Sequence, residues 1–214
     1  LPNLEAKFVA ANTLIGLDKQ GNLSETQEVR KEQKTLKHIR HKIFSARSPE
    51  TKRKLKERDK DTREKIAQLL EASGFLDSSS ADKMANWDPY DQNISASFFD
   101  SEWMFGVDTG FDIVIGNPPY LKEGRVSKKV FDGLRNSPYY QGKMDLWYMF
   151  ACVGIDILVD NGTLCFIATN NWVTSGGASK MRNKVISDSK ILQLVDFGNF
   201  MIFESASIHL ITVN

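Results

Sequence analysis

The run FDIVIGNPPY, residues 111–120, brings together residue types that can act on an amino group. Pro118 and Pro119 have no backbone N–H and a fixed φ, so they stiffen the chain and leave carbonyl acceptors available. The side chain of Asn117 adds a further carbonyl, and Tyr120 offers a flat face on which a planar group can stack. Two acceptors on a rigid corner suit a group with two N–H donors, such as an exocyclic amine or an amide.

The chemistry that such a corner favours is alkylation of a weak nitrogen nucleophile. An aromatic amine shares its lone pair with its ring and therefore attacks poorly. When both of its hydrogens are accepted, the nitrogen moves toward a tetrahedral shape, and the positive charge that develops on it is stabilised. The same four residues could instead form a simple turn, although the string should arise by accident in only on the order of one chain in a thousand.

Strand and helix patterns alternate along the chain and predict an α/β fold. We expect a mainly parallel, doubly wound sheet whose last strand enters antiparallel. In such sheets, ligands bind beyond the carboxyl ends of the strands, which is where the corner lies. The expected strands are residues 6–11, 113–115, 163–169, 191–197 and 208–214, and the expected helices near them are 145–159 and 178–187.

Residues 24–73 differ from the rest of the chain and predict an inserted, charged helical hairpin. Two helices, 24–44 and 50–72, each carry a thin apolar seam, so we expect a mostly solvated hairpin outside the main core. From Ser24 to Glu71 there are 15 Lys/Arg and nine Asp/Glu, a run that is either a solvated spacer or a contact with DNA phosphates. The seam residues are Val29, Leu36, Ile39 and Ile43 in the first helix and Leu55, Thr62, Ile66 and Leu69 in the second.

The composition predicts a globular protein of the cytoplasm. A chain of 214 residues that is 41% hydrophobic can bury one core plus an appendage. No run in the sequence is apolar enough to span a membrane, and the start does not resemble a secretory signal. Cys152 and Cys165 lie in core-like segments and predict no disulfide. His38 and His41 lack further ligands nearby, so no metal site is predicted.

The run FDIVIGNPPY resembles the catalytic motif of S-adenosylmethionine-dependent amino methyltransferases. Residues 87–106, WDPYDQNISASFFDSEWMFG, resemble a segment of the type IIG restriction-modification enzymes, in which an adenine-specific DNA methyltransferase is fused to an endonuclease. The resemblance continues through residues 145–175 and 194–214. It implies a partial Rossmann-like class I methyltransferase fold over residues 1–214, S-adenosylmethionine as the cofactor and double-stranded DNA as the substrate, with no membrane partner.

The resemblance also implies roles for the corner residues. Asn117 and the carbonyl of Pro118, on the corner that Pro119 completes, would accept from the target amine. Tyr120 would stack on an adenine that is flipped out of the duplex, since the amine is otherwise inside it. Phe203 matches the position of a second aromatic ring against the opposite face of that base, although a core phenylalanine before the last strand would look the same.

The cofactor would be held by Asn12, Asn117 and Asp145. Asn12 matches the position that meets the adenine of the cofactor, where simpler family members usually have Asp. Asp145 matches the methionine end, but an acid at a helix start also stabilises the helix. The family's glycine-rich cofactor loop and ribose-binding acid do not occur in the sequence, and Gly176-Gly177 follows the wrong strand to replace them.

The chain therefore resembles a methyltransferase domain from its third strand onward. We expect this chain alone to be inactive and to expose a sheet edge that promotes self-association. Two other functions remain open. One is a methyltransferase with the same corner that acts on a protein glutamine or on guanine in ribosomal RNA, and the other is a DNA-binding module without catalysis.

The first prediction concerns Phe203. If its ring stacks on the extruded base, Phe203→Ala should weaken the holding of that base by about 1–3 kcal/mol. Fluorescence of 2-aminopurine at the target position of a DNA duplex reports the extrusion. An unchanged signal from a folded variant would assign Phe203 to the core instead.

Overall fold

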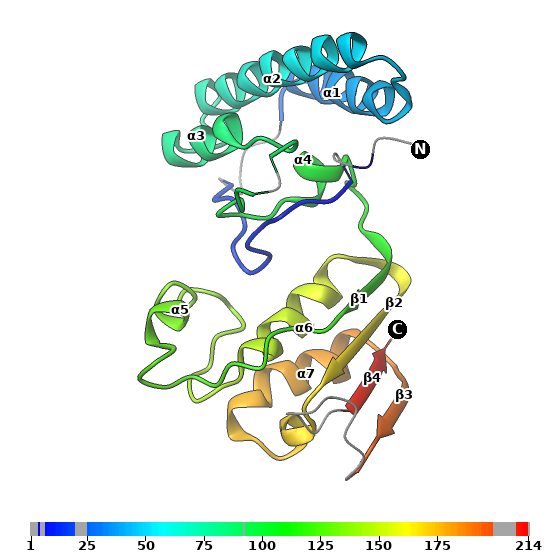
Figure 1. The fold of residues 1–214 in the computed structure, drawn as a ribbon. Helices are drawn as coiled ribbons and strands as arrows, with labels where there is room; N and C mark the ends of the chain where they lie inside the picture. The colour runs from blue at the N-terminus through cyan, green and yellow to red at the C-terminus, as the bar shows by residue number, and fades with distance from the viewer. Residues whose placement is uncertain (1–3, 5–6, 20–24, 92, 199–208, 214) are drawn as a thin grey trace. The chain divides into compact units, whose positions relative to one another are not determined.

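The computed structural model describes residue 4 and residues 7–19, 25–91, 93–198 and 209–213. The chain divides into two compact units, Leu1–Asp108 and Thr109–Asn214 (Figure 1). Each unit is described by itself below.

The first unit is built on two long helices that lie side by side (Figure 1). Helix α1 spans Gln27–Ser45, and the side chain of Thr26 caps it by accepting from the backbone N–H of Val29. Helix α2 spans Pro49–Ala72, with Ser48 as its N-cap and proline in the first turn. Both helices lie in the segments predicted from the sequence.

The inner face of this helical pair belongs to the core of the first unit. Val29 and Leu36 of α1 and Ile66 of α2 are buried together with Trp87 and Trp103 from the connecting chain. The apolar seams thus contribute to a core of the first unit, and the expectation that the hairpin lies outside the core of the sheet stays a prediction. Aromatic residues of the segment after residue 86 complete the core that the helices alone could not close.

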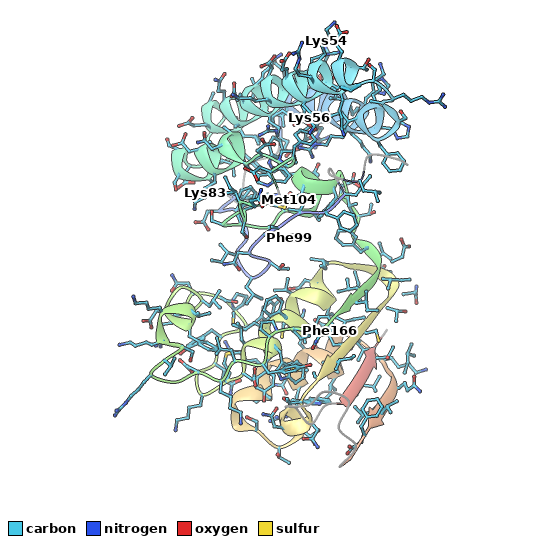
Figure 2. All side chains as sticks on the ribbon, viewed as in Figure 1. Lys54, Lys56, Lys83, Phe99, Met104 and Phe166 are labelled. Atoms are coloured by element: carbon cyan, nitrogen blue, oxygen red, sulfur yellow. The ribbon has the colours of Figure 1, made fainter. Side chains whose placement is uncertain are left out.

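Two short helices and a packed loop supply the rest of the first unit. Helix α3, Ser78–Asn86, follows an Asp77 cap and was not predicted. Helix α4, Ser101–Phe105, ends at Gly106 in a left-handed conformation. Figure 2 marks Phe99 and Met104 in this region, and Met104 is only 1% exposed.

The expected strand at residues 6–11 does not form among the residues described. Its last residue, Ala11, makes a single parallel bridge with Ala96, and no ladder extends from it. One bridge cannot satisfy a row of backbone groups, so this part of the chain remains irregular.

A buried ion-pair network fixes the two long helices to the unit. Asp59 of α2 is fully buried and accepts from Arg40 of α1 at 2.9 Å and from Arg63 of α2 at 2.7 Å. The guanidinium of Arg40 also donates to the carbonyl oxygens of Trp103 and Met104. These contacts hold α1, α2 and the chain around α4 in one arrangement.

The second unit contains a four-stranded sheet with the order β1-β2-β4-β3 (Figure 1). The last strand lies antiparallel between β2 and β3, as predicted for a strand that enters against the others. Strands β1 and β2 pair in parallel, so their carboxyl ends lie at the same edge of the sheet. The strands are β1 Phe111–Gly116, β2 Leu158–Ala168, β3 Ile191–Asp196 and β4 His209–Val213.

Helix α6, Leu146–Asp156, covers one face of this sheet. A Cβ atom at Gly154 would lie 2.5 Å from a side-chain atom of Leu164 on β2, so the helix can approach this closely only at a glycine. Phe166 of β2, labelled in Figure 2, also borders that glycine and is 5% exposed. Cys152 is buried, which confirms its expected place in the core, whereas Cys165 is half-buried. Neither cysteine forms a disulfide.

The opposite face of the sheet is open over β1. Ile113 and Ile115 are 69% and 78% exposed. The further helices of this unit, α7 at Ser179–Asp188 and α5 at Lys128–Asp132, leave these side chains uncovered. A doubly wound sheet is covered on both faces, so the described unit shows one half of that expected arrangement. In the parts of the chain that the structure describes, no helix is long and apolar enough to cross a membrane.

The ion-pair network generates a prediction about stability. Asp59→Ala should reduce the free energy of unfolding by about 3–5 kcal/mol, because the buried guanidinium of Arg63 and the largely buried one of Arg40 lose their carboxylate. Urea unfolding followed by circular dichroism measures this change. The control Glu57→Ala removes an exposed acid from the same helix and should change stability by no more than about 0.5 kcal/mol. Equal stability of the two variants would show that the network contributes nothing net.

Candidate functional site

The corner predicted from the sequence lies at the carboxyl end of β1, beside the end of β2. Gly116, the last residue of β1, pairs with Phe166, and Asn117 follows it directly. Pro118 is buried and anchors the corner, while Asn117 and Pro119 are exposed. The turn therefore fixes a backbone carbonyl and a side-chain amide at the sheet edge, where parallel strands leave room for a ligand.

The hydroxyl of Tyr120 closes a small network within the corner. It lies within hydrogen-bond reach of the Asn117 side-chain oxygen and of the Ile167 carbonyl oxygen, the latter at 2.9 Å. An amide oxygen has two lone pairs, so Asn117 can still accept one N–H from a bound group. The pKa of Tyr120 is raised, first by burial and then by the negative charge of Asp145, which keeps the hydroxyl protonated.

Asp145 is a buried acid on the same side of the sheet. Asp145 is 3% exposed, and its backbone forms an antiparallel bridge with that of Lys122, just beyond the corner. Its side-chain oxygen Oδ1 is buried and accepts no hydrogen bond from the described residues. Burial raises the pKa of this carboxyl, and backbone N–H groups, led by that of Trp147, partly oppose the shift. Burying an acceptor without a donor costs folding free energy, and a ligand that brings an N–H donor recovers that free energy.

A polar cavity of about 380 Å³ adjoins Asp145. The loop after β2, with the short helical turns Asn170–Val173 and Gly176–Ala178, forms one wall. A Cβ atom at Gly177 would lie 2.2 Å from the carbonyl oxygen of Lys143, so this glycine lets the loop close against the start of α6. The lining residues are Lys122, Glu123, Lys143, Met144, Asp145, Tyr148, Asn171, Thr174 and Ser175.

Asn171 is a residue of this cavity that sequence reasoning missed. Its side-chain oxygen accepts from the hydroxyl of Tyr148 at 3.1 Å and from that of Thr169 at 2.9 Å. Because both donors meet the oxygen, the amide NH₂ is left as a donor with a fixed orientation. The polar pair Asn170-Asn171 directly after a buried strand was the signal that could have revealed it.

The residues present fit part of a sulfonium cofactor. The amino-acid end of S-adenosylmethionine carries an ammonium group, which the unpartnered oxygen of Asp145 is suited to accept. Asn117 directly follows the end of strand β1. The cavity also presents lysine and amide donors, which suit a carboxylate. Within the described residues, no group of three or more His, Cys, Asp or Glu is arranged to hold a metal ion.

Two of the predicted site residues do not belong to the described part of the second unit. Asn12 belongs to the first unit, where its side-chain oxygen accepts from the backbone N–H of Leu14 at 3.3 Å in a local turn. Its predicted contact with the cofactor adenine stays a prediction. Phe203 lies outside the described residues, so its stacking role also stays a prediction.

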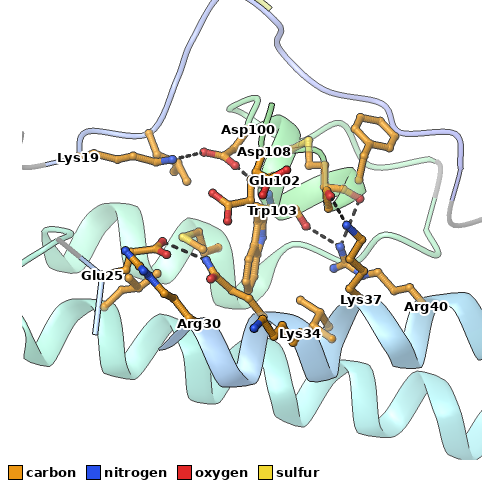
Figure 3. A pocket seen from close by; sticks show the side chains of 18 of the residues that line it. Lys19, Glu25, Arg30, Lys34, Lys37, Arg40, Asp100, Glu102, Trp103 and Asp108 are labelled. Atoms are coloured by element: carbon orange, nitrogen blue, oxygen red, sulfur yellow. Dashed lines mark hydrogen bonds and ion pairs between the residues drawn. The ribbon is translucent and has the colours of Figure 1, made fainter. Parts of the chain in front are cut away.

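A second cavity, of about 880 Å³, lies within the first unit (Figure 3). Its walls carry charges of both signs, many of them engaged, such as Lys19 with Asp100 at 2.7 Å. Lys37 reaches across from α1 to the carbonyl oxygen of Gly106 at 3.0 Å. This cavity belongs to the packing between α1 and the chain around α4.

Comparison with known proteins relates the chain to restriction-modification methylases. Residues 5–203 match a family model described as Eco57I restriction-modification methylase. The chain is 28% identical over 102 residues to the type II restriction enzyme and methyltransferase RM.Eco57I of Escherichia coli. It is 26% identical over 97 residues to the type II methyltransferase M.BstVI of Geobacillus stearothermophilus.

Each of these alignments covers 44% of the chain, but only 10% and 17% of the respective relatives. Among solved structures, a class I S-adenosylmethionine-dependent methyltransferase from Listeria monocytogenes, described as putative, aligns with a TM-score of 0.38 and 12% identity. That alignment covers 92% of this chain and 62% of the other.

Asp145 generates a prediction in which a substitution improves stability. Because the fold raises the pKa of this carboxyl, its charged form destabilises the protein above that pKa, and the cost disappears as the pH falls through it. Asp145→Asn should therefore match or exceed the wild-type stability at neutral pH, by about 1 kcal/mol at most. The difference should shrink toward pH 4, near the ordinary pKa of an aspartate.

Urea unfolding at several pH values measures this effect. Asp112→Asn, at an exposed position of β1, serves as the control and should change the free energy of unfolding by no more than about 0.5 kcal/mol. A loss of stability in Asp145→Asn at neutral pH would mean that the charged carboxylate is satisfied within the fold.

Proposed function

Since the chain belongs to the Eco57I restriction-modification methylase family, we propose that it carries the catalytic corner of an adenine-specific DNA methyltransferase. The observation that supports this most is the placement of the Asn117–Tyr120 corner at the carboxyl end of β1, next to the buried acceptor of Asp145. The corner presents acceptors, and an exocyclic amine presents two donors.

The corner residues divide the tasks of this mechanism among them. Asn117 Oδ1 and the carbonyl of Pro118 accept the two hydrogens of the adenine amine, which frees the nitrogen lone pair and stabilises its growing positive charge. Pro118 and Pro119 hold these acceptors rigid, so little reorganisation is needed during the reaction. Tyr120 fixes the Asn117 oxygen through its hydroxyl and offers its ring to the extruded base.

The cofactor, when bound, supplies an electrophilic methyl group. Asp145 would accept from its ammonium group, and Asn12 would meet its adenine. The methylated nitrogen carries a positive charge and returns to neutrality by releasing a proton to water. A positioned base is unnecessary, because a protonated aromatic amine is a strong acid.

We propose duplex DNA as the substrate. Methylation of an adenine in a duplex requires that the base be flipped out of the helix. The amine is paired inside the helix, so the nucleotide must leave the stack to reach a corner at a sheet edge. A protein glutamine or a guanine in ribosomal RNA also presents a planar NH₂ group, and substrate assays distinguish them. A DNA substrate agrees with a location in the cytoplasm.

We also propose that the open face and edge of β1 favour self-association. Strand β1 pairs on one side only within the described sheet, and it exposes Ile113 and Ile115. An unpaired edge beside exposed apolar side chains is a surface for another chain.

The test of the proposed function is Asn117→Ala in the full-length protein, because this chain alone is expected to be inactive. Methyl transfer to adenine in DNA should fall by about 100-fold or more, because a group that acts in the transition state is lost. Binding of the DNA substrate should stay within about threefold, since the contact does not serve docking. Transfer of a radiolabelled methyl group measures the first quantity and fluorescence anisotropy the second.

The matched control is Asn93→Ala, which removes an exposed amide from the first unit. It should leave both quantities unchanged. Methyl transfer by Asn117→Ala within about threefold of wild type would rule out the assigned role.

A further inference from the structure

The positive charge of the helical pair is concentrated at one end. Residues 33–56 contain nine Lys and Arg and one acid, Glu50, whereas the rest of the pair carries slightly more acids than bases. We call residues 33–56 the basic end. Its cationic residues are Lys34, Lys37, Arg40, Lys42, Arg47, Lys52, Arg53, Lys54 and Lys56, and it also contains His38 and His41.

The structure places these residues around the turn between α1 and α2. The basic end consists of the second half of α1, the connection at Ala46–Ser48 and the first two turns of α2. Some of its cations are engaged within the unit. Lys54 pairs with Glu50 at 2.7 Å, and Lys56 lies 4.5 Å from the ring centre of Tyr90. Figure 2 labels both lysines on α2.

Other cations of the basic end are exposed and have no ion-pair partner among the described residues. They come from both helices and from the turn, so they surround the end of the pair. These residues are Lys34, Lys42, Arg47 and Arg53, and the exposed imidazoles of His38 and His41 lie among them.

Helix stability does not explain this concentration of charge. Cations near the carboxyl end of α1 are favoured by the helix dipole, but Lys52 and Arg53 lie near the amino end of α2, where cations are disfavoured. Like charges gathered at one place also repel each other. Lys34, Lys42, Arg47 and Arg53 bear such a cost without an ion-pair partner among the described residues, which indicates an anionic partner.

The basic end is also held firmly. Arg40 and Lys37, which belong to it, donate to carbonyl oxygens of residues 103, 104 and 106 on the chain around α4, as Figure 3 shows. Asp59 locks Arg40 from the other helix. A solvated spacer between domains would not need these contacts, whereas a docking surface must keep its charges in place.

We propose that the basic end binds the phosphate backbone of duplex DNA, independently of sequence. This inference rests on the proposed function, because it names the part that holds the substrate of that reaction. From Lys34 to Lys42 the helix rises about 12 Å, and duplex DNA carries one charge per about 1.7 Å of its axis. Several phosphates therefore lie within reach of the exposed cations.

The test uses the 214-residue chain, a labelled DNA duplex without a defined recognition sequence, and no cofactor. The triple variant Lys42→Gln, Arg47→Gln, Arg53→Gln removes three exposed charges of the basic end. Fluorescence anisotropy should show at least about tenfold weaker binding near 0.1 M salt. Between about 50 and 200 mM salt, the slope of log K against log salt should become less steep by two to three, as expected when about three phosphate contacts are lost.

The matched control Lys31→Gln, Lys60→Gln, Lys83→Gln removes the same charge from exposed positions outside the basic end. It should leave the binding within about threefold and the slope within about one. Equal losses in the two triple variants, an absence of duplex binding by the wild-type chain, or tighter binding to single-stranded RNA or polyglutamate would overturn the proposal.

This experiment measures DNA binding and not methyl transfer. A full-length protein that binds duplex DNA through the basic end but transfers no methyl group would contradict the proposed function alone. Conversely, a full-length protein that carries the triple substitution and still methylates adenine normally, at unchanged DNA affinity, would contradict this inference alone.

Discussion

The parallel pairing of β1 with β2 is the constraint on which the candidate site depends. It brings the ends of two strands, separated by about fifty residues in the chain, to one edge of the sheet. Asn117 follows one strand and Asn171 follows the other, while Asp145 precedes the helix that crosses between them. Glycine at position 154 permits that helix to lie close enough for the edge to form a compact polar site.

Burial decides the chemistry of this edge more than the number of its charged groups. Asp145 is shielded from water and lacks a partner for one oxygen, and Tyr120 stays protonated beside it. The unpartnered oxygen of Asp145 costs folding free energy. It is useful only when a donor arrives, so the stability lost in the free protein becomes affinity for a ligand.

Sequence reasoning located the features that depend on local signals. Ser48-Pro49 and Gly74 marked the ends of α2, and the strand before the Asn-Pro-Pro-Tyr corner was identified because apolar residues run into a rigid turn. Features that depend on tertiary partners were missed. The burial of the helical pair needed Trp87 and Trp103 from a later segment, and the orientation of Asn171 needed the hydroxyl of Tyr148. A strand at residues 6–11 failed because its neighbour supplies one bridge only.

The buried carboxylate of Asp59 also sets the register of α1 against α2. A slip of one helical turn, about 5.4 Å, would move it away from Arg40 and leave buried cations without a counter-charge. The connection at Ala46–Ser48 lies beyond this lock. Both helices could therefore lengthen together at that end by whole heptads, each adding about 10 Å of reach, while the rest of the unit keeps its packing. The helical pair can thus vary in length at the end that carries the connection, while its contacts with the rest of the first unit stay the same.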